Sequence, residues 1–396
     1  MAVMDQPRSN PPSVSLINDP KFRALAYQVI VAAIVVALLV WIGQNTAANL
    51  AAQNKTTGFD FLFRTAGFNI SFSLFPFDRN SYYWEAFLVG LTNTLLVSAI
   101  AIFFSTVIGF VVGIARLSSN WIVARAATLY VEIIRNIPLL LQLFFWYFAV
   151  LKAMPAVKES YVFFGDFVLN QRGLYIPKPL PDEQFPVVWL ALLAALVIGA
   201  VLKVWARRRL EATGKRFPVF ITFIAALVVL PTIAWVASGA SVSFELPELS
   251  GFNYKGGVYL PPELVALVWG LSIYTASFIA ETVRGGILSV NRGQTEAAQS
   301  LGIREGDRLR LVIIPQAMRV IIPPLTSQYL NLTKNSSLGA AIAFPELVNV
   351  FTGTTLNQTG KAIEVISLTM LVYLTFSLSV SALMNIYNAR VALVER

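Results

Sequence analysis

Long uncharged apolar runs alternate with short polar segments along the whole chain. A transmembrane helix needs about 20 predominantly apolar residues. On that criterion the sequence predicts an all-α integral membrane protein with eight spans, the seventh of which is irregular because it contains Pro323, Pro324 and Lys334. The predicted spans are Ala24–Ile42, Ala86–Ala115, Asn136–Leu151, Gln184–Leu202, Phe217–Val236, Leu264–Ala280, Val320–Ala343 and Val365–Ile386.

The distribution of Lys and Arg orients these spans. With the N-terminus placed inside, twenty of the thirty basic residues fall on the inner side and nine on the outer side, while Lys334 lies within a span. Cytoplasmic loops carry the excess of Lys and Arg, so the pattern predicts both termini in the cytoplasm. The first span is favoured as a retained anchor over a signal peptide, because its apolar run is longer than a usual signal core and no small-x-small site directly follows.

Composition excludes several classes of protein. Hydrophobic residues make up 56% of the 396 residues and charged residues 13%, which excludes a purely soluble or a disordered chain. The chain has no Cys and no His, so thiol nucleophiles, disulfides and imidazole chemistry are excluded. Gly214-Lys215 is followed by Arg216 and lacks the upstream Gly of a P-loop. Energy for uphill transport would therefore come from an ion gradient or from another subunit.

Three segments lie outside this regular alternation of spans. Residues 1–20 are polar and Pro-rich and predict a disordered cytoplasmic tail. Residues 21–85 combine the anchor span with an external Phe-rich segment, which we interpret as an interfacial amphipathic segment. Residues 155–262 predict an external loop, a two-span hairpin and a second external loop.

The inner loop 281–319 carries the most informative pattern. Thr295 is placed to cap a short helix over Glu296–Leu301, and Gly302 supplies the left-handed residue that ends it. A second helix is expected from about Glu305, and Pro315 marks the return to the membrane. Physical reasoning leaves two interpretations open: a small-residue surface that another protein docks on, or a helix lying on the lipid headgroups.

Several motifs here resemble those of one known family. Glu296-Ala297-Ala298, Gly302 and Ile314-Pro315-Gln316-Ala317 resemble the EAA loop of ATP-binding cassette (ABC) importer permeases. Further strings are similar to the polar amino-acid branch of that family (the histidine, glutamine and general L-amino-acid permeases): Gly90–Leu95, Tyr130–Gln142, Tyr274–Ile287, Pro315–Arg319 and Lys334–Leu338. The extra first span, the Phe-rich segment and the insertion at 155–262 resemble the larger permease subunit of general L-amino-acid importers.

The resemblance implies a type I ABC-importer permease domain over 86–390, with five core spans, in a bacterial inner membrane. It implies a transport subunit and not an enzyme, with no cofactor on this chain, because ATP and Mg would be bound by a dimeric ATP-binding subunit. Glu296, Ala297, Ala298 and Gly302 would couple to that subunit. The other implied partners are a second permease, with a paralogue favoured over a second copy, and a periplasmic amino-acid-binding protein.

Polar residues at membrane depth predict a substrate path between spans six and seven. Lys334 is costly inside a bilayer, and its neighbours are polar as well. The residues of this candidate path are Tyr274, Ser277, Asn331, Lys334, Asn335 and Ser336. The alternative is structural: Lys334 pairs with carbonyls or an acid and joins two helices. The i, i+3 spacing also predicts ion pairs Glu132–Arg135 and Glu281–Arg284.

Two other functions compete with ATP-driven import of L-amino acids. An ion-coupled secondary amino-acid transporter is disfavoured because the spans carry almost no acidic residues and the inner loop is left unexplained. A membrane enzyme is disfavoured by the absence of His, Cys and clustered acids near a span.

Overall fold

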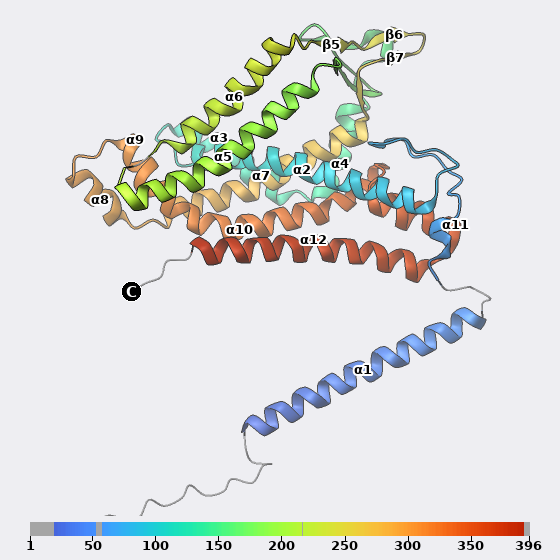
Figure 1. Cartoon of the computed structure of the whole chain (residues 1–396). Helices are drawn as coiled ribbons and strands as arrows, with labels where there is room; N and C mark the ends of the chain where they lie inside the picture. The colour runs from blue at the N-terminus through green and yellow to red at the C-terminus, as the bar shows by residue number, and fades with distance from the viewer. Residues whose placement is uncertain (1–19, 53–57, 216, 392–396) are drawn as a thin grey trace, which may run out of the picture.

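The computed structural model of the chain describes residues 20–52, 58–215 and 217–391. In these ranges long helices form the body of the molecule, and short strands gather at one end (Figure 1). The predicted N-terminal tail lies outside the described residues apart from Pro20, where the first helix begins. The long helices are α1 (Pro20–Ala52), α2 (Tyr83–Ala115), α5 (Pro186–Thr213), α6 (Val219–Ser238), α7 (Pro262–Leu288), α10 (Ile314–Asn335) and α12 (Ala362–Val391).

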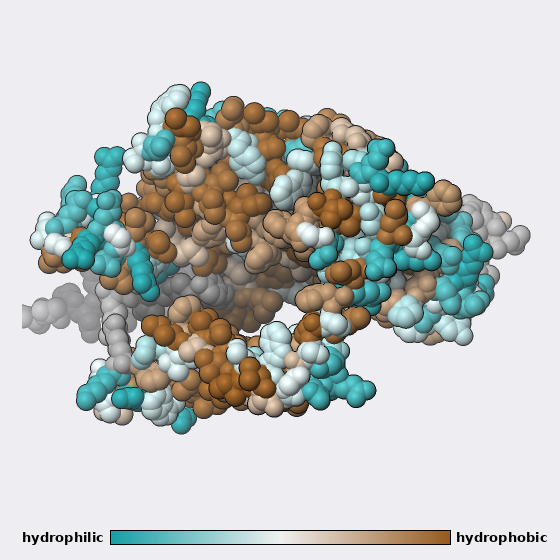
Figure 2. All heavy atoms as spheres, turned by 90° about the horizontal axis from the view of Figure 1, so that it is seen from above, coloured by the Kyte–Doolittle hydropathy of each residue, from teal (hydrophilic) through white to brown (hydrophobic). Residues whose placement is uncertain are grey.

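Seven described helices are long and apolar enough to cross a membrane, and a bent helix pair raises the number to eight. The predicted eight-span organisation is confirmed in this form. Figure 2 shows a broad hydrophobic belt across the bundle, with hydrophilic side chains gathered at both ends. Several helices run past their predicted bounds: α5 continues to Thr213, because the Arg, Leu, Glu and Ala residues at its inner end favour helix in water as well.

The third predicted span is the bent pair. A straight span over Asn136–Leu151 is wrong: α3 (Trp121–Asn136) and the segment from α4 (Leu139–Phe144) into a π-helix, η3 (Phe145–Leu151), meet at 104°. Pro138 causes the break, because the residue before a proline is forced out of the helical region.

The side chain of Gln142 repairs the backbone at this bend. Its Nε2 donates to the carbonyl oxygens of Ile134 and Ile137, each at 2.9 Å. Carbonyls freed by a helix break need such a partner at membrane depth. Gln142 is therefore a structural residue of the bend.

The Phe-rich segment packs onto the bundle. It contains the short 3-10 helix η2 (Asp60–Phe63), and the Phe61 ring, which is 1% exposed, lies 6.0 Å from the Tyr83 ring and 6.3 Å from the Phe351 ring. Phe59 and Phe63 are exposed. Phe61 thus attaches the segment to the bundle, and the interpretation as an interfacial amphipathic segment stays a prediction.

The insertion is a helical hairpin whose two flanking loops contain strands, which the sequence analysis did not predict. α5 packs on α6 (Figure 1), and Tyr175 of one loop pairs with Tyr259 of the other. The antiparallel strands are β1 (Tyr161–Phe163), β2 (Phe167–Asn170), β3 (Gly173–Ile176) and β8 (Val258–Leu260) in one sheet, β4 (Lys178–Pro181) with β5 (Val242–Glu245), and β6 (Glu248–Ser250) with β7 (Asn253–Lys255). Backbone pairing thus joins the two external loops directly.

The most extensive helix contact in the bundle joins α2 to α7. A Cβ added at Gly113 would lie 2.8 Å from the carbonyl oxygen of Ala280 and 2.8 Å from the Cβ of Val283. One turn earlier, a Cβ at Gly109 would lie 2.5 Å from a methyl carbon of Ile279. Small residues let membrane helices approach this closely and gain dispersion contacts, so these glycines set the distance between the two helices.

Candidate functional site

The EAA motif lies on α8 (Arg292–Ser300), at the end of the bundle away from the strands (Figure 1). Its N-cap is Asn291, whose Oδ1 accepts from the Gly293 amide at 2.8 Å. The prediction that Thr295 caps a helix beginning at Glu296 is wrong, because Asn291 offers an equally good cap one turn earlier. Thr295 therefore lies inside the helix.

The three residues of the motif do not share one face. Glu296 and Ala297 are exposed, whereas Ala298 is 4% exposed and packs inward. The outward surface of α8 thus presents a carboxylate beside a small side chain. Ala298 does not contribute to the open small-residue surface expected from the sequence, and it seats the helix on the rest of the loop.

Gly302 ends α8 as predicted. Its φ is +70°, its amide donates to the Gln299 carbonyl at 2.9 Å, and the next amide, of Ile303, donates to the Ala298 carbonyl at 3.1 Å. This pair of bonds is a Schellman end, which requires a left-handed residue at Gly302. No heavy atom lies within 4 Å of a Cβ added there, so a substitution would be strained by backbone conformation alone.

The loop continues directly into the seventh span. α9 (Glu305–Arg308), the π-helix η5 (Leu309–Ile313), α10 and the 3-10 helix η6 (Ser336–Ile342) form one uninterrupted helical run. Pro323 and Pro324 lie inside α10 without breaking it. The irregularity predicted in this span is a change from α to 3-10 geometry at Ser336, and no unwound segment is present.

One side-chain contact ties α8 back to this span. Gln316 Nε2 donates to Gln294 Oε1 at 3.2 Å, across the turn between α8 and α10. The loop 281–319 is thus held to the N-terminal end of α10 by covalent continuity and by this hydrogen bond.

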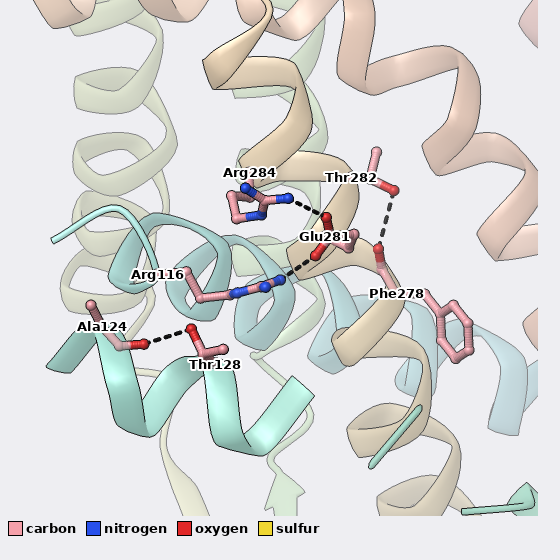
Figure 3. A network of polar contacts seen from close by, with 7 residues as sticks. All are labelled: Arg116, Ala124, Thr128, Phe278, Glu281, Thr282 and Arg284. Atoms are coloured by element: carbon pink, nitrogen blue, oxygen red, sulfur yellow. Dashed lines mark hydrogen bonds and ion pairs between the residues drawn. The ribbon is translucent and has the colours of Figure 1, made fainter. Parts of the chain in front are cut away.

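A charged cluster joins α2 to α7 at the same end of the bundle (Figure 3). Glu281 accepts from Arg284 Nη2 at 2.6 Å and also from Nη1 of Arg116, which is the C-cap of α2. The predicted Glu281–Arg284 pair is confirmed, and Arg116 is a member that the sequence spacing could not reveal. Thr128 and Thr282 in the same view bond only within their own helices.

The predicted Glu132–Arg135 pair is wrong. In the part of the chain that the structure describes, no ion pair involves either residue. The Arg135 guanidinium carbon lies 5.0 Å from the centre of the Phe278 ring on α7. Arg135 therefore makes a cation–π contact between α3 and α7.

The residues of the predicted substrate path are divided between different surroundings. Ser277 is fully buried and donates to the Tyr274 carbonyl of its own helix at 2.6 Å, and Tyr274 packs against the main hydrophobic cluster. Ser336 is also fully buried and donates to the Thr333 carbonyl at 2.7 Å. These three side chains are occupied by contacts within the protein.

The remaining path residues are more open. Asn331 and Lys334 are exposed and Asn335 is half-buried. Across the described residues, Lys334 Nζ makes no hydrogen bond and no ion pair, so the structural alternative of a lysine paired with an acid or carbonyls is not met. Of the six path residues, Lys334 alone lines a cavity of about 240 Å³ bounded by α2, α10 and α12.

Sequence reasoning missed three residues around this cavity. Ser98 and Tyr373 line it, and the Tyr373 hydroxyl lies 3.4 Å from the carboxylate of Glu346, which is fully buried in the segment between α10 and α12. Burial raises the pKa of Glu346 to about 7, although the amides of Val348 and Asn349 donate to it. No sequence pattern singles out Ser98, Glu346 or Tyr373. They lie in segments far apart in the chain, and only the fold brings them together. Among the described residues no acidic cluster could hold a metal ion.

An eight-span bundle with a small capped helix at one end, joined to one long span, defines a multi-span membrane protein. Residues 105–393 match the family described as "Binding-protein-dependent transport system inner membrane component", and the chain belongs to this family. Over 382 residues, covering 96% of this chain and 95% of the relative, it is 49% identical to the general L-amino acid transport system permease protein AapQ of Rhizobium johnstonii.

Two other relatives are similar over almost their whole length. The chain is 48% identical over 384 residues to YhdX of Escherichia coli, named as an amino-acid ABC transporter permease, with 97% of this chain and 98% of the relative covered. It is 40% identical over 424 residues to the glutamate/glutamine/aspartate/asparagine transport system permease protein BztB of Rhodobacter capsulatus, with 98% and 99% covered.

Proposed function

We propose that this chain is the permease subunit of an ABC importer that moves L-amino acids from the periplasm into the cytoplasm of a bacterium. The observation that carries the proposal is the match to AapQ over 96% of the chain, because that relative is named as a general L-amino acid permease. The match spans the insertion and the N-terminal region as well as the family domain. The chain resides in the inner membrane with both termini in the cytoplasm.

The coupling role falls to α8. Glu296 and Ala297 are exposed side by side and dock in a groove of a separate ATP-binding subunit, which binds ATP and Mg and hydrolyses the nucleotide. Ala298 seats the helix, and Gly302 fixes its end. Closure of the two ATP-binding subunits moves the loop 281–319, and the helical run through α10 transmits that movement into the membrane.

The complete importer contains further chains. A second permease, a paralogue of this one, completes the translocation domain formed over 86–390, and a periplasmic amino-acid-binding protein delivers the solute. The resemblance to the family implies such an assembly. Because this chain carries the α5–α6 insertion of the enlarged form, we expect the second permease to be a paralogue without it.

The test uses Glu296→Arg and Gly302→Val in the reconstituted complex. Charge reversal removes the carboxylate contact, and Val at φ +70° is strained. Each variant should weaken binding of the ATP-binding subunit by about tenfold or more. The matched control is Gly306→Val, because Gly306 is also exposed with no neighbour within 4 Å of an added Cβ but lies in helix α9.

The readouts are copurification of the ATP-binding subunit and ATP-driven uptake of L-amino acids into proteoliposomes. Normal uptake and normal copurification in both variants would refute the coupling role of α8. Failure of the wild-type complex to import any L-amino acid with its binding protein present would refute the proposed function itself.

A further inference from the structure

The α5–α6 hairpin is packed within itself and not against the rest of the bundle. Gly199 of α5 lies so close to Phe223 of α6 that an added Cβ would be 2.1 Å from a ring carbon. No residue of α6, which the structure describes completely, is buried, and among the described elements neither helix packs extensively on any element except the other. The outward faces of the hairpin are therefore open to lipid tails, which are as apolar as Leu.

The lengths of the two helices place a basic cluster at the membrane surface. α6 has 20 residues and rises about 30 Å, which is the thickness of the hydrocarbon core. The apolar part of α5, residues 186–202, rises about 25 Å and ends where the basic residues begin. Within residues 203–215 the only acid is Glu211, and the basic residues are Lys203, Arg207, Arg208, Arg209 and Lys215. The cluster therefore lies at the depth of the lipid headgroups, at the α5–α6 turn.

Contacts within the protein occupy only part of this cluster. Arg207 pairs with Glu211 at 3.1 Å, and the guanidinium carbon of Arg209 lies 5.2 Å from the centre of an indole ring. Among the residues that the structure describes, the side chains of Lys203 and Arg208 make no hydrogen bond, ion pair or ring contact. Two cations at headgroup depth are thus free to bind an anion.

Each of these two cations borders a hollow whose walls are mostly apolar. Arg208 lines one of about 490 Å³, together with Ala200, Val201, Val204 and Trp205. Lys203 lines one of about 290 Å³, together with Ala206, Arg207, Leu210, Phe217 and Val219. A phospholipid has the same division into a charged phosphate and apolar chains, and clusters of Lys and Arg beside the membrane bind anionic headgroups.

We propose that the hairpin binds anionic phospholipids at the α5–α6 turn, with Lys203 and Arg208 each holding a phosphate and the apolar walls of each hollow covering an acyl chain. Lipid is favoured over an acidic protein surface because Val201 and Val204 border the apolar part of the span, where acyl chains lie. Because the hairpin lacks extensive packing on the bundle, these lipids would fix the position of its end. The proposal is independent of the solute that the chain transports.

The experiment measures lipid binding to the purified full chain in detergent by native mass spectrometry, with phosphatidylglycerol and phosphatidylethanolamine as probes. Phosphatidylglycerol should bind at two sites and about tenfold more tightly than phosphatidylethanolamine, whose ammonium group cancels the charge of its phosphate. Lys203→Gln and Arg208→Gln should each weaken one site by about fivefold, the effect of one basic residue at an anionic surface. The double variant should weaken both sites. Both side chains are exposed on α5, so the helix tolerates these changes.

The matched control removes the same two charges elsewhere, as Lys255→Gln in β7 with Arg79→Gln just before α2, where both side chains are exposed. It should leave binding unchanged, and the charge-keeping exchange Lys203→Arg with Arg208→Lys should bind as the wild type does. An equal loss in the control, unchanged binding in the Gln double variant, or no preference over phosphatidylethanolamine would each overturn the assignment. Normal lipid binding with loss of a copurifying subunit would identify a protein partner at this end instead.

Discussion

The helices α6 and α7 are both apolar spans, yet they occupy opposite environments. α6 is the more hydrophobic of the two, and none of its residues, all of which the structure describes, is buried. α7 is less hydrophobic, and most of its middle is buried against α2, α10 and the bent pair. The same contrast separates the packed bundle from the whole α5–α6 insertion.

In this membrane protein a high hydrophobicity indicates a helix that faces lipid, and not a helix that is buried in the protein. Lipid tails are as apolar as Leu, so a very hydrophobic helix is stable when it faces lipid and gains little from leaving it. α7 instead carries Gly270 and Gly286, where an added Cβ would lie 2.6 Å from Leu143 and 2.3 Å from Ile321. The interior position of α7 therefore follows from these close contacts and not from its hydrophobicity.

The largest expected effect contrasts two phenylalanines. Phe61 is 1% exposed within the bundle, and Phe164 is 90% exposed in the turn between β1 and β2 of the insertion. Phe61→Ala should cost about 3–5 kcal/mol of unfolding free energy, as large-to-small changes at buried aromatics do, whereas Phe164→Ala should change it little. Denaturant unfolding of the purified chain in detergent measures both, and equal losses would show that the insertion is packed as tightly as the bundle.

A smaller effect is expected where α2 and α7 touch. Gly113→Ala forces a Cβ to within 2.8 Å of the Ala280 carbonyl and should cost about 1–3 kcal/mol. Gly43→Ala, in the exposed span α1 with nothing within 4 Å, should leave stability equal or slightly higher. The measurement is the thermal unfolding temperature of each variant, and a tolerated Gly113→Ala would mean that the helix pair can separate freely.

The smallest effect separates two ion pairs. Glu281→Gln leaves Arg116, whose side chain is 11% exposed, without its partner and should cost on the order of 1 kcal/mol. Glu211→Gln in the insertion breaks a pair with Arg207 whose side chains are 82% and 65% exposed, so its effect should be near zero. The measurement is the thermal unfolding temperature at low and high salt: the loss in Glu281→Gln should persist at high salt, because a partly buried pair is screened little.

The sequence supported the span count and the end of α8, because both depend on local patterns. An uninterrupted apolar run predicts α6, and Gly302 can be recognised as a left-handed helix end from its neighbours alone. α3 was missed because its charged residues, Arg125, Glu132 and Arg135, interrupt the apolar run although they lie toward one side of the helix.

Contacts between segments far apart in the sequence could not be predicted from the sequence. Arg116 and Glu281 are separated by 165 positions in the sequence, and nothing in that stretch would predict that the two side chains meet. The same holds for Ser98, Lys334 and Tyr373, which come from three helices and meet only through the packing of the bundle. Local rules identified Lys334 as unusual, but the identity of its surroundings depends on the fold.

The uninterrupted helix from Glu305 to Ile342 has a mechanical consequence. With a rise of about 1.5 Å per residue, Lys334 lies about 45 Å along the rod from Glu305. A tilt of about 5° at the inner end would therefore sweep the far end through about 4 Å, roughly one atom diameter, without any side chain changing its rotamer. The π-helical turn at Leu309–Ile313 is the place where this rod can flex, so a movement imposed on the loop at Glu305 would reach the polar residues around Lys334.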